Sequence, residues 1–448
     1  MNQASLPVAI IGAGPVGLAA AAYLLARGET PLVLEAGPAA GHAIRQWHHV
    51  RMFTPWRFCV DRAAAALLAT RGWSPPPAED LPTGGELVAR YLEPLAAALA
   101  PYLHVNARVI AVSRQNTDKL RTAGRERLPF VLRIAAPDGT TRRVMARAVI
   151  DASGTWFTPN PAGADGLPAL GERQAAERIA SGIPDVLGAD REIYRGRKTA
   201  VVGSGHSALN ALIELAALRE EAPGTRLHWL IRKDRIETAF GGEAADALPA
   251  RGALGIAARA LVEAGAVEVL APFRIEAIGR GAGGALRIEG DHAGAPAQLA
   301  ADRMIVATGF RPDFTMLREV RLALDPWLEC AGSIGPLIDP NLHSCGTVRP
   351  HGAAALAHPE ADFFIAGMKS YGRAPTFLLA TGYEQVRSIA AHLVGDEEAA
   401  ARVELELPET GVCTARPAPR IAVPSAKSCC GAAKPEPAIA AARADCCG

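Results

Sequence analysis

The sequence predicts an α/β fold with two parallel sheets, and three observations support this. Residues 8–11 form a short apolar strand that runs into a glycine turn, GAGPVG at 12–17, and then into an Ala- and Leu-rich helix over 18–27. The same order returns where residues 199–202 precede GSGHSA at 203–208 and a helical stretch. Almost half of the 448 residues are apolar, which is enough for large buried cores.

The first glycine turn has the spacing of a dinucleotide-binding turn in a Rossmann-like domain. The first glycine permits the tight turn, the second lets a pyrophosphate approach the backbone, and the third lets the helix pack against the strand. Free N–H groups at the helix start hold phosphate charge. The next strand, 31–34, ends at an acid that suits an adenosine ribose. The predicted cofactor contacts are Gly12, Gly14, Pro15, Gly17 and Glu35.

Residues 41–62 are rich in Arg, Trp and His. In flavoproteins of the disulfide-reductase kind, the equivalent segment carries a C-x-x-x-x-C pair against the flavin, whereas here Cys59 stands alone. A reduced flavin without that pair passes its electrons to another acceptor, such as dioxygen or a bound substrate. Two interpretations stay open, a surface loop with aromatic anchors or a flavin wall made of Trp47, His48, His49, Arg51 and Trp56.

The next hundred residues predict a mixed segment. Thr83 is expected to cap a helix over 84–100. A strand is expected over 104–112, and a hairpin over 130–134 and 142–145 around the turn at 138–139. A strand over 148–154, which ends in a glycine, is expected to return to the first sheet. Val109 and Gly154 are predicted to contact the cofactor.

The second glycine turn is the accepted G-x-G-x-x-A variant, with Gly203, Ser204, Gly205, His206 and Ser207 as predicted contacts. The strand over 226–231 ends without a ribose acid.

Arg232 and Lys233 follow that strand instead. Two cations there suit a 2′-phosphate, so NADPH is favoured over NADH, although an ordinary basic loop is the alternative. A helix over 257–264, a strand over 267–270 and a β excursion over 275–288 follow. The strand over 304–309 ends at Gly309, which lets the backbone approach a cofactor.

A last strand over 363–366 ends at Gly367, and Pro375 and Thr376 are expected to begin a helix that continues to residue 393. Such a helix can aim its N-terminus at a flavin, where its dipole favours the negative charge of the reduced ring. The alternative is a packing helix that closes the sheet.

Taken together, the chain resembles proteins of the flavin-containing monooxygenase type, in which an NADPH domain is inserted in an FAD domain. The resemblance is carried by GAGPVG at 12–17, Glu35, DASG at 151–154, GSGHSA at 203–208 and ATGFRPD at 307–313. It implies an FAD domain over 1–160 and 303–410, a connection over 161–198, an NADPH domain over 199–302 and a flexible Cys-rich tail over 411–448.

A narrower resemblance comes from residues 341–352 and 367–388, which are similar to flavoproteins found with arsenic-resistance genes. It implies an NADPH- and FAD-dependent monooxygenase that oxidises trivalent organoarsenicals with O2. His343, Cys345 and His351 form a cluster of soft or borderline ligands in the same region. A thiolate suits trivalent arsenic, whereas the alternative is buried packing.

The C-terminal tail has a composition of its own. Residues 415–448 are rich in Ala and Pro and lack an apolar period, which predicts a mobile segment. Two neighbouring pairs, Cys429 with Cys430 and Cys446 with Cys447, resemble the terminal pair of mercuric reductases. Such pairs can capture a soft metalloid, whereas an incidental tail and a zinc site are the alternatives.

Composition and charge limit the function classes. The net charge is +1, and no basic run is interleaved with aromatics, so we expect no nucleic-acid partner. Residues 1–7 are too short and polar for a signal peptide, and we expect a cytoplasmic enzyme without a membrane partner. Two other functions stay open, a reductase of a disulfide or soft metal ion delivered by the tail, and a metalloid-binding chaperone. A homodimer is one assembly that the sequence leaves open.

Overall fold

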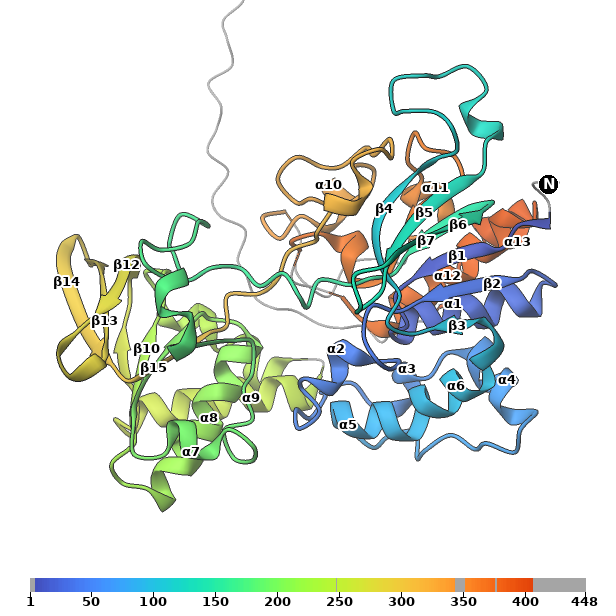
Figure 1. The fold of residues 1–448 in the computed structure, drawn as a ribbon. Helices are drawn as coiled ribbons and strands as arrows, with labels where there is room; N and C mark the ends of the chain where they lie inside the picture. Colours follow the sequence, from blue (N-terminus) through green and yellow to red (C-terminus); the bar gives the residue numbers. More distant parts are fainter. Residues whose placement is uncertain (1–4, 247, 343–350, 375–376, 406–448) are drawn as a thin grey trace, which may run out of the picture.

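The computed structural model describes residues 5–246, 248–342, 351–374 and 377–405. Two units lie side by side in Figure 1. The first unit combines the N-terminal part of the chain with the C-terminal helices, and the second contains the middle of the chain, coloured green to yellow. The α/β fold class, with one unit inserted in the other, is therefore confirmed.

A five-stranded parallel sheet forms the middle layer of the first unit. In spatial order its strands are β16 (Phe363–Ile365), β7 (Ala148–Asp151), β1 (Val8–Ile11), β2 (Pro31–Leu34) and β3 (Leu103–His104). All four residues of β1 are buried because both faces of this sheet are covered. The strand after residue 147 pairs with β1, as expected.

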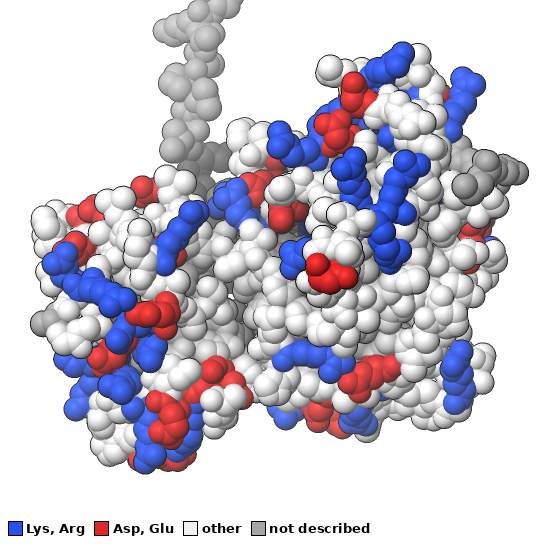
Figure 2. All heavy atoms as spheres, viewed as in Figure 1, with Lys and Arg blue, Asp and Glu red and all other residues white. Residues whose placement is uncertain are grey.

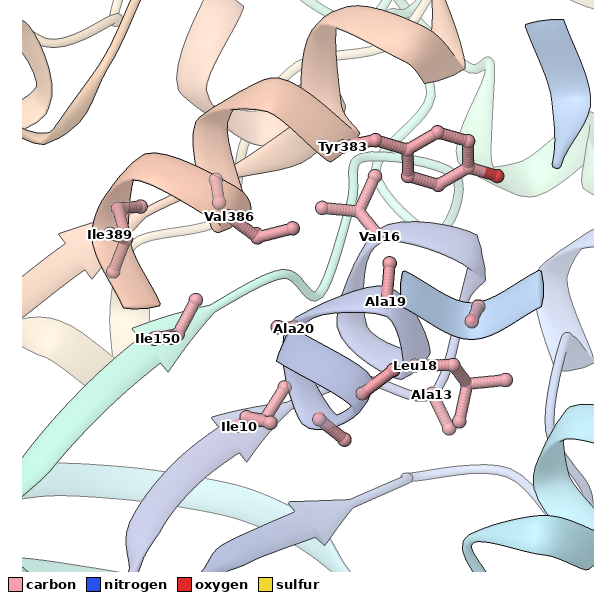
Figure 3. Close-up of a cluster of buried hydrophobic side chains, with 14 of the residues drawn as sticks. Ile10, Ala13, Val16, Leu18, Ala19, Ala20, Ile150, Tyr383, Val386 and Ile389 are labelled. Carbon is pink, nitrogen blue, oxygen red and sulfur yellow. The ribbon is translucent and has the colours of Figure 1, made fainter. Parts of the chain in front are cut away.

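Helices cover one face of this sheet. The two main ones are α1 (Pro15–Ala26) and α12 (Leu379–Leu393). Figure 3 shows Val16 and Ala19 of α1 facing Tyr383 and Val386 of α12, with Ile10 of the sheet below. Small side chains on α1 allow this close packing, and the helix is buried nearly all round.

An antiparallel sheet covers the other face. Its strands are β4 (Arg108–Arg114), β5 (Phe130–Ala135) and β6 (Thr141–Ala146). Neighbouring residues of β1 point to opposite faces, so Ile10 packs with the helices and Ile11 with the antiparallel sheet.

The segment between β2 and β4 differs from the prediction in two places. Its helices are α2 (His42–Arg45), α3 (Trp56–Cys59), α4 (Arg62–Ala69), α5 (Gly84–Leu87), the π-helix η2 (Val88–Leu92), α6 (Glu93–Ala98) and η3 (Ala100–Tyr102). Thr83 caps α5 through a complete capping box with Glu86, as expected. The single helix expected over 84–100 is interrupted by the π turn. The strand expected over 104–112 is two strands, because β3 pairs in the parallel sheet and β4 in the antiparallel one.

The second unit repeats these three layers. Its parallel sheet contains, in spatial order, β11 (Glu268–Leu270), β10 (Arg226–Leu230), β9 (Lys198–Val202), β15 (Arg303–Val306) and β8 (Ile179–Ser181). The helices α8 (His206–Glu221) and α9 (Pro249–Glu263) pack in one core. The opposite core lies against β12 (Phe273–Arg280), β13 (Leu286–His292) and β14 (Ala295–Ala301).

Three predicted boundaries need correction. β8 lies in the segment expected to be a connection over 161–198, and β15 lies beyond the expected domain end at 302. Both belong to the second sheet because β15 pairs with β9 on one side and β8 on the other. The last long helix begins at Leu379, because Leu378 is extended, and the predicted start at Pro375 and Thr376 lies outside the described residues.

Shorter elements complete the described part of the chain. They are η4 (Arg125–Arg127), η5 (Arg173–Arg178), α7 (Arg191–Tyr194), η6 (Ile236–Ala239), η7 (Glu243–Ala245), η8 (Ala282–Gly284), η9 (Thr315–Leu317), α10 (Gly335–Ile338), α11 (Ala353–Leu356), η10 (Gly367–Tyr371) and α13 (Glu397–Ala401). Within the described part of the chain, none of the helices combines the length and the apolar character needed to cross a membrane.

Candidate functional site

The first glycine turn leaves open space at the start of α1. Gly12 has a φ of 101°, and a Cβ on it would lie 2.7 Å from the carbonyl oxygen of Ala152. A Cβ on Gly17 would lie 2.0 Å from the carbonyl oxygen of Gly12. Gly14, by contrast, faces open space and precedes a helix start without a side-chain cap. The first N–H groups of α1 therefore stay available for a phosphate.

Glu35 stands at the end of β2, beside this turn, and is buried. Its Oε2 accepts the N–H of Ala13 at 2.7 Å, and its Oε1 accepts the N–H of Gly37 at 2.8 Å. These two bonds fix the orientation of the carboxylate. Each oxygen keeps accepting capacity for a ribose hydroxyl, so the group fits an adenosine ribose.

A cavity of about 530 Å³, here called the first cavity, begins at this turn and extends between the two units. Much of its wall is apolar or aromatic, and the face in Figure 2 carries few charged side chains where the units meet. Nine of the predicted cofactor residues line it: Gly12, Gly14, Pro15, Glu35, Trp47, Gly154 and Gly367 of the first unit, and His206 and Ser207 of the second. An elongated ligand can therefore bind from the phosphate turn to the boundary of the second unit.

Two of the predicted contacts are not part of this wall. Gly17 lets α1 pack closely against the turn and β1. Val109 of β4 is buried in the core between the parallel and antiparallel sheets. The sequence pattern of β4 does not indicate whether Val109 packs in this core or lines a cavity.

A buried ion pair lies beneath the cavity wall. Lys369 in η10 donates from Nζ to Asp151 Oδ2 at 2.7 Å, and the exposed fractions of the two side chains are 1% and 0%. Lys369 also donates to Ser153 Oγ at 3.1 Å, and Ser153 donates to Asp151 Oδ1 at 2.6 Å. Ser153 itself lines the first cavity. The pair thus fixes the strand ends that border the cavity.

Sequence reasoning missed Lys369. The available signal was a lysine a few residues beyond the apolar strand 363–365, at the carboxyl end where parallel sheets hold their ligands.

Hydrogen bonds with the side-chain amide of Gln385 hold the chain that follows β16. Gly367 has a φ of 72°, and its N–H donates to Gln385 Oε1 of α12 at 2.8 Å. Gln385 in turn donates to Ser370 Oγ at 2.9 Å. Leu378 and Leu379, at the start of α12, line the first cavity. The N-terminal end of α12 therefore borders the cavity, where its dipole favours negative charge.

The second glycine turn forms a second cavity of about 450 Å³. Gly203 has a φ of 127°, and a Cβ there would lie 2.3 Å from the carbonyl oxygen of Ala307. Gly205 caps α8 and faces open space. All seven residues predicted for the second turn and the strand after it line this cavity: Gly203, Ser204, Gly205, His206, Ser207, Arg232 and Lys233. Gly309, which was predicted to contact a cofactor without a choice of site, lines it too.

The cation pair after β10 lies at the solvent-exposed rim of the second cavity. Arg232 Nη1 donates to the carbonyl oxygen of Ala164 at 2.7 Å, which holds the guanidinium near the cavity. Lys233 is exposed beside it. These two charges fit a phosphate on the ribose of a nicotinamide dinucleotide.

The two cavities share wall residues. His206, Ser207, Phe310 and Met368 line both of them. Burial is the largest cause that lowers the pKa of His206, so its ring is neutral at pH 7. Two dinucleotides bound at the two turns would approach each other at this shared wall.

An aromatic group connects the units next to the shared wall. The ring of Trp156 lies 4.8 Å from that of Phe310 and 6.4 Å from that of Trp47, measured between centroids. Trp156 Nε1 donates to Gln46 Oε1 at 2.8 Å. All three residues line the first cavity, which gives it an aromatic wall.

Among the described residues, no cysteine lines either cavity. Cys59 and Cys330 are free and buried. Burial raises the pKa of each thiol to about 12, so neither is a thiolate at neutral pH. The described part of the chain therefore contains no thiol relay beside the first cavity.

The other predicted residues lie apart from the cavities or outside the described residues. His351 is buried and does not line either cavity, and burial lowers its pKa. His343, Cys345 and the four tail cysteines fall in parts of the chain that the structure does not describe. In segment 41–62, Trp47 and Arg51 line the first cavity, whereas His48, His49 and Trp56 do not.

Comparisons with known proteins agree with this geometry. A family model described as pyridine nucleotide-disulphide oxidoreductase matches residues 6–331. A ferredoxin–NADP reductase of Rhodospirillum rubrum is 28% identical over 246 residues, which are 54% of this chain and 59% of that reductase. This match covers less than two thirds of that relative.

Two solved structures share the fold at low identity. The bacillithiol disulfide reductase of Bacillus cereus has a TM-score of 0.66 at 19% identity, covering 87% of this chain and 99% of that one. A cadaverine monooxygenase from Erwinia amylovora, bound to FAD, has a TM-score of 0.58 at 14% identity, covering 92% of this chain and 99% of that one. Both a reductase and a monooxygenase are thus built on this architecture.

The family match covers both glycine turns and most of the residues that line the two cavities. FAD and NAD(P)H are the cofactors that this match implies, and the described residues fit both of them. The chain belongs to the pyridine nucleotide-disulphide oxidoreductase family.

Proposed function

We propose that this protein is an NADPH- and FAD-dependent monooxygenase that oxidises a trivalent organoarsenical to its pentavalent form and contributes to arsenic resistance. In the balanced reaction, NADPH and a proton supply two electrons and two protons. One oxygen atom of O2 forms the new bond to arsenic, and the other leaves as water.

One observation carries the monooxygenase part of the proposal. The first cavity has a wide apolar wall, and no described cysteine lies on it. When FAD is bound, it accepts a hydride from the nicotinamide and supplies electrons for the reduction of O2. The aromatic wall made of Trp47, Trp156 and Phe310 excludes water and accommodates a small uncharged substrate.

Other residues of the chain support the choice of cofactors. The helix starts at Gly14 and Gly205 offer N–H groups to the two pyrophosphates. Arg232 and Lys233 favour NADPH over NADH. The buried Asp151–Lys369 pair keeps the strand ends beside the first cavity in place.

The arsenical substrate rests on the resemblance of residues 341–352 and 367–388. A trivalent organoarsenical is uncharged at neutral pH, which suits the apolar wall. We further propose that Cys429, Cys430, Cys446 and Cys447 capture the arsenical and raise its concentration near the cavity.

The discriminating experiment measures NADPH consumption by the FAD-loaded chain under air and under argon, with and without methylarsenite. The monooxygenase proposal predicts consumption that requires both O2 and methylarsenite, with pentavalent product formed in equal amount. Equal turnover under argon with a disulfide or mercuric ion would identify a reductase instead. No turnover together with tight arsenite binding would identify a metalloid chaperone.

The role of the tail is tested with a variant in which the four tail cysteines are replaced by serine. We expect the methylarsenite concentration needed for half-maximal rate to rise, while NADPH still reduces the flavin at the wild-type rate. Loss of flavin reduction in this variant would contradict a delivery role.

A further inference from the structure

Three metal-binding side chains meet where the two units face each other. His48 and His49 lie after α2 in the first unit, and Asp185 lies after β8 in the second. One ligand atom of each lies within 4.8 Å of the other two, and His48 Nε2 lies 4.0 Å from Asp185 Oδ2. Two atoms bound to one tetrahedral zinc ion are about 3.4 Å apart, so small side-chain rotations would bring these atoms to binding distance.

His48 is oriented for metal binding. Its Nδ1 lies 3.2 Å from the carbonyl oxygen of Arg45. Because a carbonyl oxygen only accepts, Nδ1 carries the hydrogen, and Nε2 presents its lone pair on the side of Asp185. A backbone carbonyl that fixes the distal nitrogen in this way is common among metal-binding histidines.

His49 has both ring nitrogens buried without a hydrogen-bond partner. Such atoms are costly to bury unless another group satisfies them. A metal ion bound to one of these nitrogens would satisfy it.

Asp185 is held in place by its own loop. Its Oδ2 accepts the N–H of Ala189 at 2.9 Å, and its N–H donates to Asp190 Oδ2 at 3.0 Å. A Cβ on Gly188 would lie 2.3 Å from Asp185 Oδ2, so a glycine leaves room for the carboxylate in this position. The carboxylate is thus positioned before any ligand arrives.

A further acid, Glu214, lies near Asp185. Glu214 of α8 has a buried Oε2 without a hydrogen-bond partner. Burial, and next the charge of Asp185, raises the pKa of Glu214 to about 7.

From this juxtaposition we propose that His48, His49 and Asp185 bind a divalent transition metal of the zinc class, and that the ion ties the two units together. Two imidazoles and one carboxylate suit zinc, cobalt and nickel better than magnesium or calcium. Trp47 and Ile183, close in sequence to the ligands, line the first cavity. A bound ion would therefore stiffen the wall of that cavity where the two units meet.

The direct test titrates Co2+ into the FAD-loaded full chain and records its absorption spectrum. Cobalt bound by nitrogen and oxygen gives weak visible bands, whereas thiolate ligands add an intense near-ultraviolet band. This difference separates the proposed site from the tail cysteines, and a chain with the four tail cysteines replaced by serine removes their contribution.

We expect one cobalt ion per chain without the thiolate band in the serine-tail background. The His49→Ala and Asp185→Ala variants should each weaken its binding about tenfold or more. The matched control is His392→Ala, because His392 contacts a single carboxylate, Glu397, at 2.8 Å and should leave cobalt binding unchanged. Cobalt binding that is equal in wild type and His49→Ala, or absent from the serine-tail chain, would overturn the proposal.

A second readout tests the bridge between the units. Zn2+ should raise the thermal unfolding temperature of the serine-tail chain and slow amide hydrogen exchange over residues 46–50 and 184–190. His49→Ala should lose both effects while it keeps the wild-type flavin spectrum, since His49 does not line the first cavity. Slowed exchange on one side only would contradict a bridging ion.

Discussion

The two glycine turns of this protein share one backbone design, but the strand after each turn ends in different residues. Gly12 and Gly203 both have positive φ, and each lies against a carbonyl oxygen at the end of a neighbouring strand. The strand after the first turn ends in the buried Glu35, whereas the strand after the second ends in the exposed Arg232 and Lys233. The turn therefore suits the pyrophosphate of a dinucleotide. The residues after the next strand suit either a free ribose hydroxyl or a ribose that carries a phosphate.

The two sites also differ in burial. The first rests on a buried ion pair, Asp151 with Lys369, and holds Glu35 through two backbone N–H groups. The second uses exposed cations at its rim. This contrast suits a cofactor that stays bound in the first site and one that exchanges in the second.

The largest expected effect comes from matched glycine substitutions. Gly12→Val should yield protein without FAD, because a β-branched residue cannot adopt that φ beside the Ala152 carbonyl oxygen. Gly203→Val should keep FAD but raise the Km for NADPH at least about a hundredfold, a loss of about 3 kcal/mol of binding. Flavin absorbance and steady-state kinetics measure the two. Equal loss of FAD in both variants would contradict separate sites.

The next effect tests the buried charge pair. Lys369→Met leaves Asp151 charged and buried, so the free energy of unfolding should fall by about 3–5 kcal/mol. Combining it with Asp151→Asn should restore much of this loss. Denaturant unfolding measures both. The control is Arg274→Ala in the second unit, whose ion pairs are partly exposed and should contribute less than about 1 kcal/mol.

The third prediction concerns the pH dependence of the free energy of unfolding, compared between wild type and the Asp61→Asn variant. Burial raises the pKa of Asp61, the N-cap of α4, to about 6, above its ordinary value of 3.8. Ionisation is therefore harder in the folded state, and this group lowers stability as pH rises from about 4 to about 6. Asp61→Asn keeps an acceptor for the cap and should gain up to about 3 kcal/mol over wild type above pH 6. A difference that does not vary with pH would contradict this.

The smallest expected effect concerns the rim cations. Arg232→Ala combined with Lys233→Ala should raise the Km for NADPH about 10–100-fold and leave that for NADH nearly unchanged, because the lost bonds go to the 2′-phosphate alone. Arg235→Ala is the control, since Arg235 pairs with Glu237 and does not line the second cavity. An equal change for both nucleotides would show that these cations do not select NADPH.

Local patterns predicted much of the fold and both nucleotide turns. Residue type and short-range spacing are enough to predict the strands over 8–11 and 31–34 and the helix cap at Thr83. The same holds for the acid at Glu35, which directly follows the second of these strands. The strand pairing of residues 303–306 was not predictable in this way, because the apolar pattern of a buried strand does not indicate which strands it pairs with.

Long-range contacts were beyond the sequence for the same reason. Lys369 and Asp151 are 218 positions apart, and the residues around each of them give no indication that the two form an ion pair. The segment 41–62 showed its aromatic character, but Trp47 lines the cavity while His48 and His49 lie near Asp185. Side-chain direction in an irregular segment depends on packing that only the folded chain supplies.

The proposed function requires that electrons from NADPH reduce dioxygen at the first cavity and that one of its oxygen atoms is transferred to the substrate. The sharpest test is turnover of methylarsenite by the FAD-loaded chain with NADPH under isotopically labelled dioxygen, with mass spectrometry of the product. We expect one labelled oxygen atom in each pentavalent arsenical formed. An unlabelled product, formed while NADPH is consumed, would contradict oxygen transfer from dioxygen.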